Sequence, residues 1–282
     1  MINRRDFFRF SMAGLGALSA TKLFGAYQTR PLGVQLYTVR EQAEKDLAGT
    51  LAAIREIGYQ EVELYWNVYN HPAVELRKML DDHGLRAPSG HVNYEGLDSK
   101  IDYAQALGFE YVVCPMLPKN MRGKVDGFKQ AADQFNIWGE KIRQRGMRFG
   151  FHDHNYEFRS FGGKTGFETL MERTDPKLVF IEMDCYWIVQ AGQDPVEMFK
   201  RYGNRIRLLH LKDRKPGFPI SQELNAAAEH FTEVGAGTLD WKAILSAAKQ
   251  DGVEHLFVER DSGDLPALES LRISYKNLQS LL

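Results

Sequence analysis

The sequence predicts a (β/α)8 barrel that forms a single α/β domain. Eight short runs of β-branched and aromatic residues recur along the chain, and a helical pattern follows each of them. These eight units fill the roughly 256 residues beyond residue 26, which is a typical length for such a barrel. A doubly wound open sheet is the competing fold. It often carries a glycine-rich phosphate loop after its first strand, and this sequence has none.

The predicted elements alternate along the chain without a linker or a shift in composition. The predicted strands are Leu32–Tyr37, Glu61–Tyr65, Ala87–His91, Tyr111–Met116, Arg148–His152, Leu178–Asp184, Ile206–Leu211 and Leu256–Glu259. The predicted helices are Glu41–Ile57, Pro72–His83, Ser99–Leu107, Val125–Arg145, Gly166–Arg173, Pro195–Tyr202, Asp240–Gln250 and a last one from Leu265. Asp240 is a typical N-cap residue, and glycines stand where several helices should end.

Residues 1–26 are predicted to be a twin-arginine export signal, and residues 27–282 the barrel. Arg4 and Arg5 precede two phenylalanines, a mild apolar run covers 11–20, and small residues follow near Ala26. The alternative is an amphipathic helix packed on the barrel. The signal predicts an exported, periplasmic protein.

Charge and composition limit the partners of the chain. The whole sequence has 36 basic and 37 acidic side chains. Residues 1–26 contain four of the basic ones and one of the acidic ones, so the remainder has 32 and 36, a net charge of −4. An acidic chain without a long basic run disfavours nucleic-acid binding. No stretch approaches 18 apolar residues, so no membrane span is expected in the mature protein. The sequence leaves the oligomeric state undecided, and a homodimer is one alternative.

The two cysteines are not expected to form a structural framework. Cys114 and Cys185 both lie in apolar, strand-like segments, where a buried thiol is ordinary. Two cysteines are too few to be interpreted as a disulfide scaffold. No bridge is predicted.

Polar side chains gather at the carboxyl ends of seven predicted strands. Residues two apart share one face of a strand, so the inward pairs are Gln35 and Tyr37, Glu61 and Glu63, Ser89 and His91, His152 and His154, Glu182 and Asp184, His210 and Lys212, and Glu259 and Asp261. Barrel enzymes build their active sites at this end. A single residue of this kind could be satisfied by backbone or water, but many ionised groups crowded together are costly unless a metal or substrate organises them.

This convergence predicts one divalent metal ion. The best set has one ligand from each of the last four strands: His152, Asp184, His210 and Glu259. Two imidazoles and two carboxylates suit Mn, Zn, Fe or Co better than Mg. His154, Glu182 and Asp213 are candidates for contacts to these ligands or to the substrate, and an ion pair with Lys212 is the alternative for Glu182.

At these residues the sequence resembles a known superfamily. The segments that carry the resemblance, in chain order, are Gly33–Arg40, Glu61–Leu64, Phe151–Phe158, Met183–Trp187, His210–Asp213, Gly235–Asp240 and Val258–Glu259. Their ordered set is similar to the xylose isomerase-like TIM barrels, and more closely to the sugar phosphate isomerase/epimerase branch. The resemblance implies one divalent metal held by residues of strands five to eight, where it polarises neighbouring sugar oxygens. Relatives include ketose 3-epimerases, inosose dehydratases and isomerases, and AP endonucleases.

Two positions depart from the pattern of these relatives. Many epimerases have a glutamate that serves as ligand and as acid/base where this chain has His152. A metal-bound imidazole cannot take a proton, so a relay of two glutamates is not expected. Trp187 stands where related sequences often have a histidine, and its ring is expected either to stack on a sugar or to cover the barrel mouth.

The predicted function is a metal-dependent isomerase or epimerase that removes a proton beside the carbonyl of a sugar or keto-sugar. The expected catalytic residues are Glu259, Glu63, His91 and His154, with Glu259 or Glu63 as the base. Expected substrate contacts are Gln35, Tyr37, Tyr65, Trp187 and Lys212, with Trp66 beside Tyr65 and Trp187 in an aromatic floor. An unphosphorylated sugar or glycoside is the favoured substrate. The alternatives are a metal-dependent lyase or hydrolase of 3-keto-glycosides or inososes, and a non-catalytic sugar-binding barrel. An AP endonuclease would need a basic groove, which an acidic chain disfavours.

Overall fold

Eight parallel strands close into a barrel in the computed structural model, which describes residues 31–224 and 228–282. The predicted export signal at 1–26 lies outside these residues. The barrel order is β1-β12-β9-β8-β5-β4-β3-β2, so each strand pairs with the next barrel strand in the chain and β12 pairs with β1. The strands are β1 (Leu32–Gln35), β2 (Glu61–Leu64), β3 (Arg86–His91), β4 (Tyr111–Cys114), β5 (Arg148–His152), β8 (Val179–Asp184), β9 (Ile206–Leu211) and β12 (His255–Val258).

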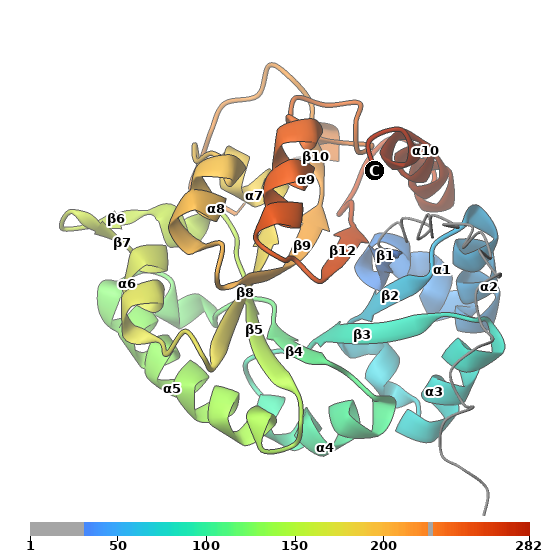
Figure 1. The fold of residues 1–282 in the computed structure, drawn as a ribbon, viewed down its shortest axis with the longest axis horizontal. Coiled ribbons are helices and arrows are strands. Elements are labelled where there is room, and N and C mark those ends of the chain that lie inside the picture. The colour runs from blue at the N-terminus through green and yellow to red at the C-terminus, as the bar shows by residue number, and fades with distance from the viewer. Residues whose placement is uncertain (1–30, 225–227) are drawn as a thin grey trace, which may run out of the picture.

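Helices surround the strands on the outside, as Figure 1 shows. They are α1 (Arg40–Lys45), α2 (Leu47–Ile57), α3 (Ala73–Asp82), α4 (Leu97–Leu107), α5 (Val125–Arg143), α6 (Gly166–Arg173), α7 (Cys185–Gln190), α8 (Pro195–Tyr202), α9 (Trp241–Gln250) and α10 (Ala267–Gln279). The predicted (β/α)8 barrel and its single-domain organisation are confirmed. Within the described ranges, no helix combines the length and apolarity that crossing a bilayer requires.

Two helices differ from the sequence prediction because of aspartate caps. The predicted helix Glu41–Ile57 is divided at Asp46, whose backbone is extended and whose carboxylate accepts the N–H of Gly49 at 2.9 Å. The short helix α7 was not predicted. It begins directly after β8 because Asp184 accepts the N–H of Trp187 at 3.1 Å.

Short hairpins and 3₁₀ helices lie in the segments that follow the barrel strands. Two hairpins are formed by β6 (Ser160–Phe161) with β7 (Lys164–Thr165) and by β10 (Asp213–Arg214) with β11 (Phe231–Thr232). Five 3₁₀ helices are described: η1 (Leu36–Val39), η2 (Trp66–Asn70), η3 (Lys119–Met121), η4 (Tyr156–Phe158) and η5 (Ala228–His230). The first strand ends at Gln35 rather than at Tyr37 because η1 starts there, with the side chain of Gln35 accepting the N–H of Tyr37.

An apolar layer fills the barrel below the polar strand ends. A separate buried cluster contains inward residues of three strands, Tyr111, Val113, Leu208 and Phe257, and Phe180 of a fourth strand packs against it. Val179, Ile181 and Met183 instead join the core between strands and helices. The alternation along β8 therefore points Phe180, Glu182 and Asp184 inward, as expected. This apolar layer supports the polar groups at the carboxyl ends of the strands.

Candidate metal centre and active site

The four predicted metal ligands converge at the carboxyl end of the barrel. His152 ends β5, Asp184 ends β8, His210 lies in β9 and Glu259 follows β12 directly. One ligand atom of each lies within 4.8 Å of the others, and all four side chains are buried. Residues that are far apart in the sequence thus meet in one site because parallel strands end on the same face of the barrel.

Each of the two imidazoles presents one nitrogen to this site and uses the other for support. Nδ1 of His152 lies 3.0 Å from Oε2 of Glu182, and its Nε2 lies 3.9 Å from Oδ2 of Asp184. Nε2 of His210 lies 2.6 Å from Oε2 of Glu63, and its Nδ1 lies 2.8 Å from Oε2 of Glu259. Carboxylates on the far nitrogens fix ring orientation, as they do for many histidine metal ligands.

The chemistry of the set fits a divalent transition metal. Oδ2 of Asp184 is buried and accepts no well-aligned hydrogen bond, although Nζ of Lys212 lies 3.1 Å away. This unsatisfied oxygen stands beside two imidazole nitrogens and the carboxylate of Glu259. Such a mixed nitrogen and oxygen donor set is typical of Mn, Fe, Co or Zn sites. The residues present therefore fit the predicted ion.

A second possible ligand group overlaps the first and lies deeper. It consists of His91, His152, Glu182 and His210. Oε2 of Glu182 lies 2.7 Å from Nε2 of His91 and 3.3 Å from Nε2 of His210. Each group has two residues in the lining of the cavity described below: His152 and Glu259 in the first, His91 and His152 in the second. The first group is the better candidate because its two carboxylates balance the charge of a divalent ion, whereas the second group has one carboxylate.

The buried carboxylates beneath the site differ in their proton affinity. Burial and the negative charge of Glu63 raise the pKa of Glu182 to about 7. Burial also acts to raise the pKa of Glu63, but the imidazoles of His91 and His210 outweigh it and lower that pKa to about 2. Glu63 therefore stays ionised at neutral pH, whereas Glu182 exchanges a proton near pH 7.

Lys212 pairs with three other carboxylates and not with that of Glu182. Its Nζ lies 3.1 Å from Oδ2 of Asp184, 2.7 Å from Oε2 of Glu259 and 2.9 Å from Oδ1 of Asp261. Only 1% of the residue is exposed. Burial alone would lower the pKa of Lys212, but the three carboxylates outweigh it and raise that pKa well above its usual value. The ion pair between Lys212 and Glu182 considered from the sequence is not formed.

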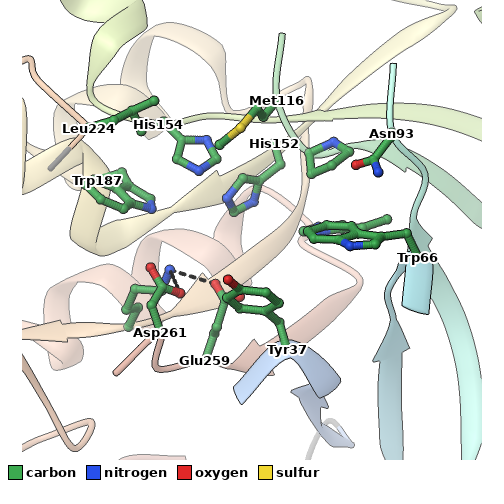
Figure 2. A pocket seen from close by; sticks show the side chains of 13 residues that line it. Tyr37, Trp66, Asn93, Met116, His152, His154, Trp187, Leu224, Glu259 and Asp261 are labelled. Carbon is green, nitrogen blue, oxygen red and sulfur yellow. Dashed lines mark hydrogen bonds and ion pairs between the residues drawn. The ribbon is translucent and has the colours of Figure 1, made fainter. Parts of the chain in front are cut away.

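A cavity of about 290 Å³ opens above these groups (Figure 2). Its ionisable lining consists of His91, His152, His154, Lys212, Glu259 and Asp261. The rest of its lining is Asn93 together with aromatic and apolar side chains: Tyr37, Trp66, Pro115, Met116, Trp187 and Leu224. The volume lies near the lower end of the range of about 300–1,000 Å³ usual for small-molecule sites.

Several of these lining residues were not predicted. Asn93 and Met116 each follow the end of a strand by two residues. The search for inward residues at strand ends would have found them if it had included residues beyond the strands and apolar ones. Leu224 comes from the segment between β10 and β11. No local pattern signals its position, because tertiary hydrogen bonds hold that segment. The amide of Asn155, for example, donates to the carbonyl oxygens of Ser221 and Glu223.

Three predicted site residues do not reach the cavity. Glu63 is fully buried, accepts hydrogen bonds from Gln35 and Ser89, and lies against His210. Gln35 is buried with it. The ring of Tyr65 packs edge-on against Tyr37 and does not line the cavity. The structure therefore does not bring the expected base Glu63, or the expected substrate contacts Gln35 and Tyr65, to the surface of this cavity.

Asp213 has a structural role instead of a role in the site. Its carboxylate accepts the backbone N–H groups of Gly235, Gly237 and Leu239, and the indole N–H of Trp241 at 2.6 Å. It therefore fixes the chain between β11 and α9. The strand-end position suggested a site contact because this pattern cannot distinguish a substrate from a neighbouring loop.

Two further imidazoles in the cavity have opposite pKa shifts. Burial and the positive charge of Lys212 lower the pKa of His154 well below its usual value. Burial opposes protonation of His91, but the charges of Glu63 and Glu182 outweigh it and raise its pKa. Nδ1 of His154 is buried and has no hydrogen-bond partner. Its ring lies 5.3 Å from that of Trp187, between centroids.

Sequence comparison finds curated relatives that carry one name. Inosose dehydratase of Clostridium botulinum strain Alaska E43 is 26% identical over 231 residues, which cover 70% of this chain and 76% of that protein. The inosose dehydratase of Geobacillus thermodenitrificans is 31% identical over 151 residues, covering 48% of this chain and 47% of the relative.

Solved structures give the same fold. A sugar phosphate isomerase/epimerase from Parabacteroides distasonis has a TM-score of 0.74 at 26% identity, covering 91% of this chain and 96% of that one. A protein named IOLI, whose crystal structure contains a zinc atom, has a TM-score of 0.65 at 17% identity, covering 89% and 97% of the two chains, and shares the fold. The family model described as xylose isomerase-like TIM barrel matches residues 51–277. The chain belongs to the xylose isomerase-like TIM barrel family.

Proposed function

We propose that this chain is a metal-dependent enzyme that removes the proton next to the carbonyl group of a sugar or cyclic keto-polyol. The observation that carries the proposal is the convergence of His152, Asp184, His210 and Glu259, of which His152 and Glu259 line a cavity that also contains the imidazoles of His91 and His154. A divalent ion bound there would polarise neighbouring carbonyl and hydroxyl oxygens and acidify the adjacent C–H bond. A non-catalytic sugar-binding barrel would not need this combination.

His154 is the best placed residue for proton transfer. Its ring lines the cavity, its Nδ1 is buried without a hydrogen-bond partner, and no described residue forms a hydrogen bond with its Nε2. Glu259, the predicted base that does line the cavity, uses Oε2 for both His210 and Lys212. A base needs a free lone pair within reach of the proton it takes. The geometry therefore favours His154 for taking the proton, with Glu259 retained as a ligand.

His91 is the matching candidate for the acid. It lines the cavity, and its Nε2 lies 2.7 Å from Oε2 of Glu182. The carboxylate orients the ring and stabilises its protonated form, so His91 could return the proton to carbon or protonate a leaving group. Two imidazoles of opposite proton affinity are a common way to divide acid and base roles.

Isomerisation or epimerisation and elimination share this first step. The sugar phosphate isomerase/epimerase neighbour supports the first outcome. The inosose dehydratase relatives support elimination of a hydroxyl group as a second candidate of equal standing. Histidine at position 152 also favours elimination. Elimination needs one base that exchanges a proton, whereas epimerisation through two glutamates needs a carboxylate at position 152.

The test combines metal content with proton exchange. The purified protein, loaded with Mn²⁺, should bind one ion per chain and exchange a substrate C–H proton with deuterated water. The probes are scyllo-inosose, D-ribulose, D-fructose and a 3-keto-glucoside, followed by NMR. Product analysis separates isomer from dehydrated product. The Asp184→Ala variant should lose the ion and the exchange together. If this variant kept full metal occupancy and full exchange, the proposed site would be wrong.

A further inference from the structure

The described lining of the cavity contains one lysine or arginine side chain, and carboxylates already surround its charged group. Among the described residues that line it, Lys212 is the one lysine or arginine. Its ammonium lies within 3.1 Å of carboxylate oxygens of Asp184, Glu259 and Asp261. Three carboxylates therefore face one ammonium group, so this network has more acidic than basic side chains.

A bound divalent ion would bring these groups to neutrality without leaving a free positive charge. Two positive charges from the ion and one from Lys212 balance the three carboxylates. A phosphate group in the cavity would then find no cation without a partner, because Lys212 is surrounded by carboxylates and the protonated form of His91 is paired with Glu182. An anion buried without such a partner loses several kcal/mol of hydration that nothing restores.

The walls of the cavity suit an uncharged ring. Trp66 and Trp187 lie on opposite sides of the cavity in Figure 2, and Tyr37 lies beneath it. Aromatic faces gain contact area from the C–H surfaces of a sugar ring and do not need a charge on the ligand. Trp66 remains 38% exposed, so part of its ring is free for such a contact.

On the basis of the proposed function, we propose that the cavity selects uncharged sugars over phosphorylated ones and that Asp261 determines this specificity. Asp261 does not belong to the four-ligand set. Its side chain is 27% exposed and lies at the open side of Lys212, with Oδ1 2.9 Å from Nζ. It accepts the N–H group that Lys212 would otherwise donate to an anionic ligand.

The experiment compares matched ligands on matched variants. Isothermal titration calorimetry of the Mn²⁺-loaded protein measures binding of D-fructose against D-fructose 6-phosphate and of D-ribulose against D-ribulose 5-phosphate. Inorganic phosphate serves as a competitor. The variants are Asp261→Asn and, as a control with the same charge change, Asp264→Asn. Asp264 is 79% exposed, pairs with Lys215 and does not line the cavity.

The proposal gives a defined pattern of affinities. The wild type should bind each uncharged sugar at least about tenfold more tightly than its phosphate, and inorganic phosphate should not compete. Asp261→Asn should reduce this ratio by about tenfold, which corresponds to about 1.4 kcal/mol. Asp264→Asn should leave it unchanged.

Three other results would overturn it, each in a different way. Tighter binding of the phosphorylated sugars by the wild type would refute the selectivity but leave the proposed function intact. An unchanged ratio in Asp261→Asn would refute the role of Asp261. Absence of binding for every sugar, together with absence of proton exchange, would refute the proposed function and this inference with it.

Discussion

Nδ1 of His152 lies 3.0 Å from Oε2 of Glu182, and this contact leaves Nε2 as the nitrogen that faces Asp184. The carboxylate thus determines which end of the ring is available to a metal. The site depends on this choice because the opposite ring orientation would direct the metal-binding nitrogen toward the barrel interior.

Glu182→Gln should lower metal affinity by about 10–100-fold, the usual effect of losing a carboxylate behind a ligating histidine. The amide retains the shape of the side chain but no longer holds the imidazole N–H groups by charge. Competition with a chelator measures the affinity. The control is Glu61→Gln, which changes an equally buried glutamate at the far end of the barrel, beside His255. Equal affinities for Glu182→Gln and the wild type would contradict the supporting role.

His154→Gln should slow exchange of the substrate proton by at least about 100-fold, since positioned acid/base groups contribute about 10²–10⁴-fold. Metal content should stay at one ion per chain, because His154 is outside the ligand set. The measurement is the rate of deuterium incorporation. His83→Gln, in which the changed residue caps α3 away from the cavity, is the matched control. A rate within about threefold of the wild type would remove His154 from the mechanism.

Asp213→Ala should lower the free energy of unfolding by about 3 kcal/mol or more, since each unpaired buried donor costs about 1–3 kcal/mol. Four backbone N–H groups, those of Arg214, Gly235, Gly237 and Leu239, and the indole of Trp241 lose their acceptor. Urea denaturation of the metal-free protein measures the effect. Metal stoichiometry of the folded variant should be unchanged. A loss of metal without a loss of stability would instead assign Asp213 to the site.

His255 should make the stability of the barrel depend on pH. Nδ1 of His255 lies 2.9 Å from Oε2 of Glu61. Burial lowers the pKa of His255, but the hydrogen bond and charge of Glu61 outweigh it and raise that pKa above 6.5. A raised folded-state pKa stabilises the protein fully below pH 6.5, and this stabilisation is lost as the pH rises through the folded value.

The difference in unfolding free energy between the wild type and His255→Gln should therefore shrink from about pH 6 to about pH 9. Urea titrations across this range measure it. The variant controls for the other histidines because they are common to both proteins. A difference that grows with pH would mean that burial dominates and that His255 is neutral in the fold.

The sequence was sufficient for the barrel and for the convergence of the four candidate ligands, because both depend on short-range alternation. A strand of known direction places every second side chain inward, so this alternation alone was enough to point His152 and Asp184 into the barrel. The alternation does not say what lies opposite a side chain. Glu63 and Asp213 satisfy the same pattern as the ligands, yet one supports His210 and the other holds a loop. Leu224 was beyond reach because contacts distant in the chain place it.

One oxygen of Glu182 serves His91, His152 and His210 together. Substitutions of these three histidines should therefore not be independent, because each single change already disturbs the partner that the others share. In a double-mutant cycle, the second substitution should cost less than it does alone. For the same reason, a change at any one of these positions during evolution would alter the selective constraint on the other two, so we expect the three histidines to be replaced together rather than one at a time.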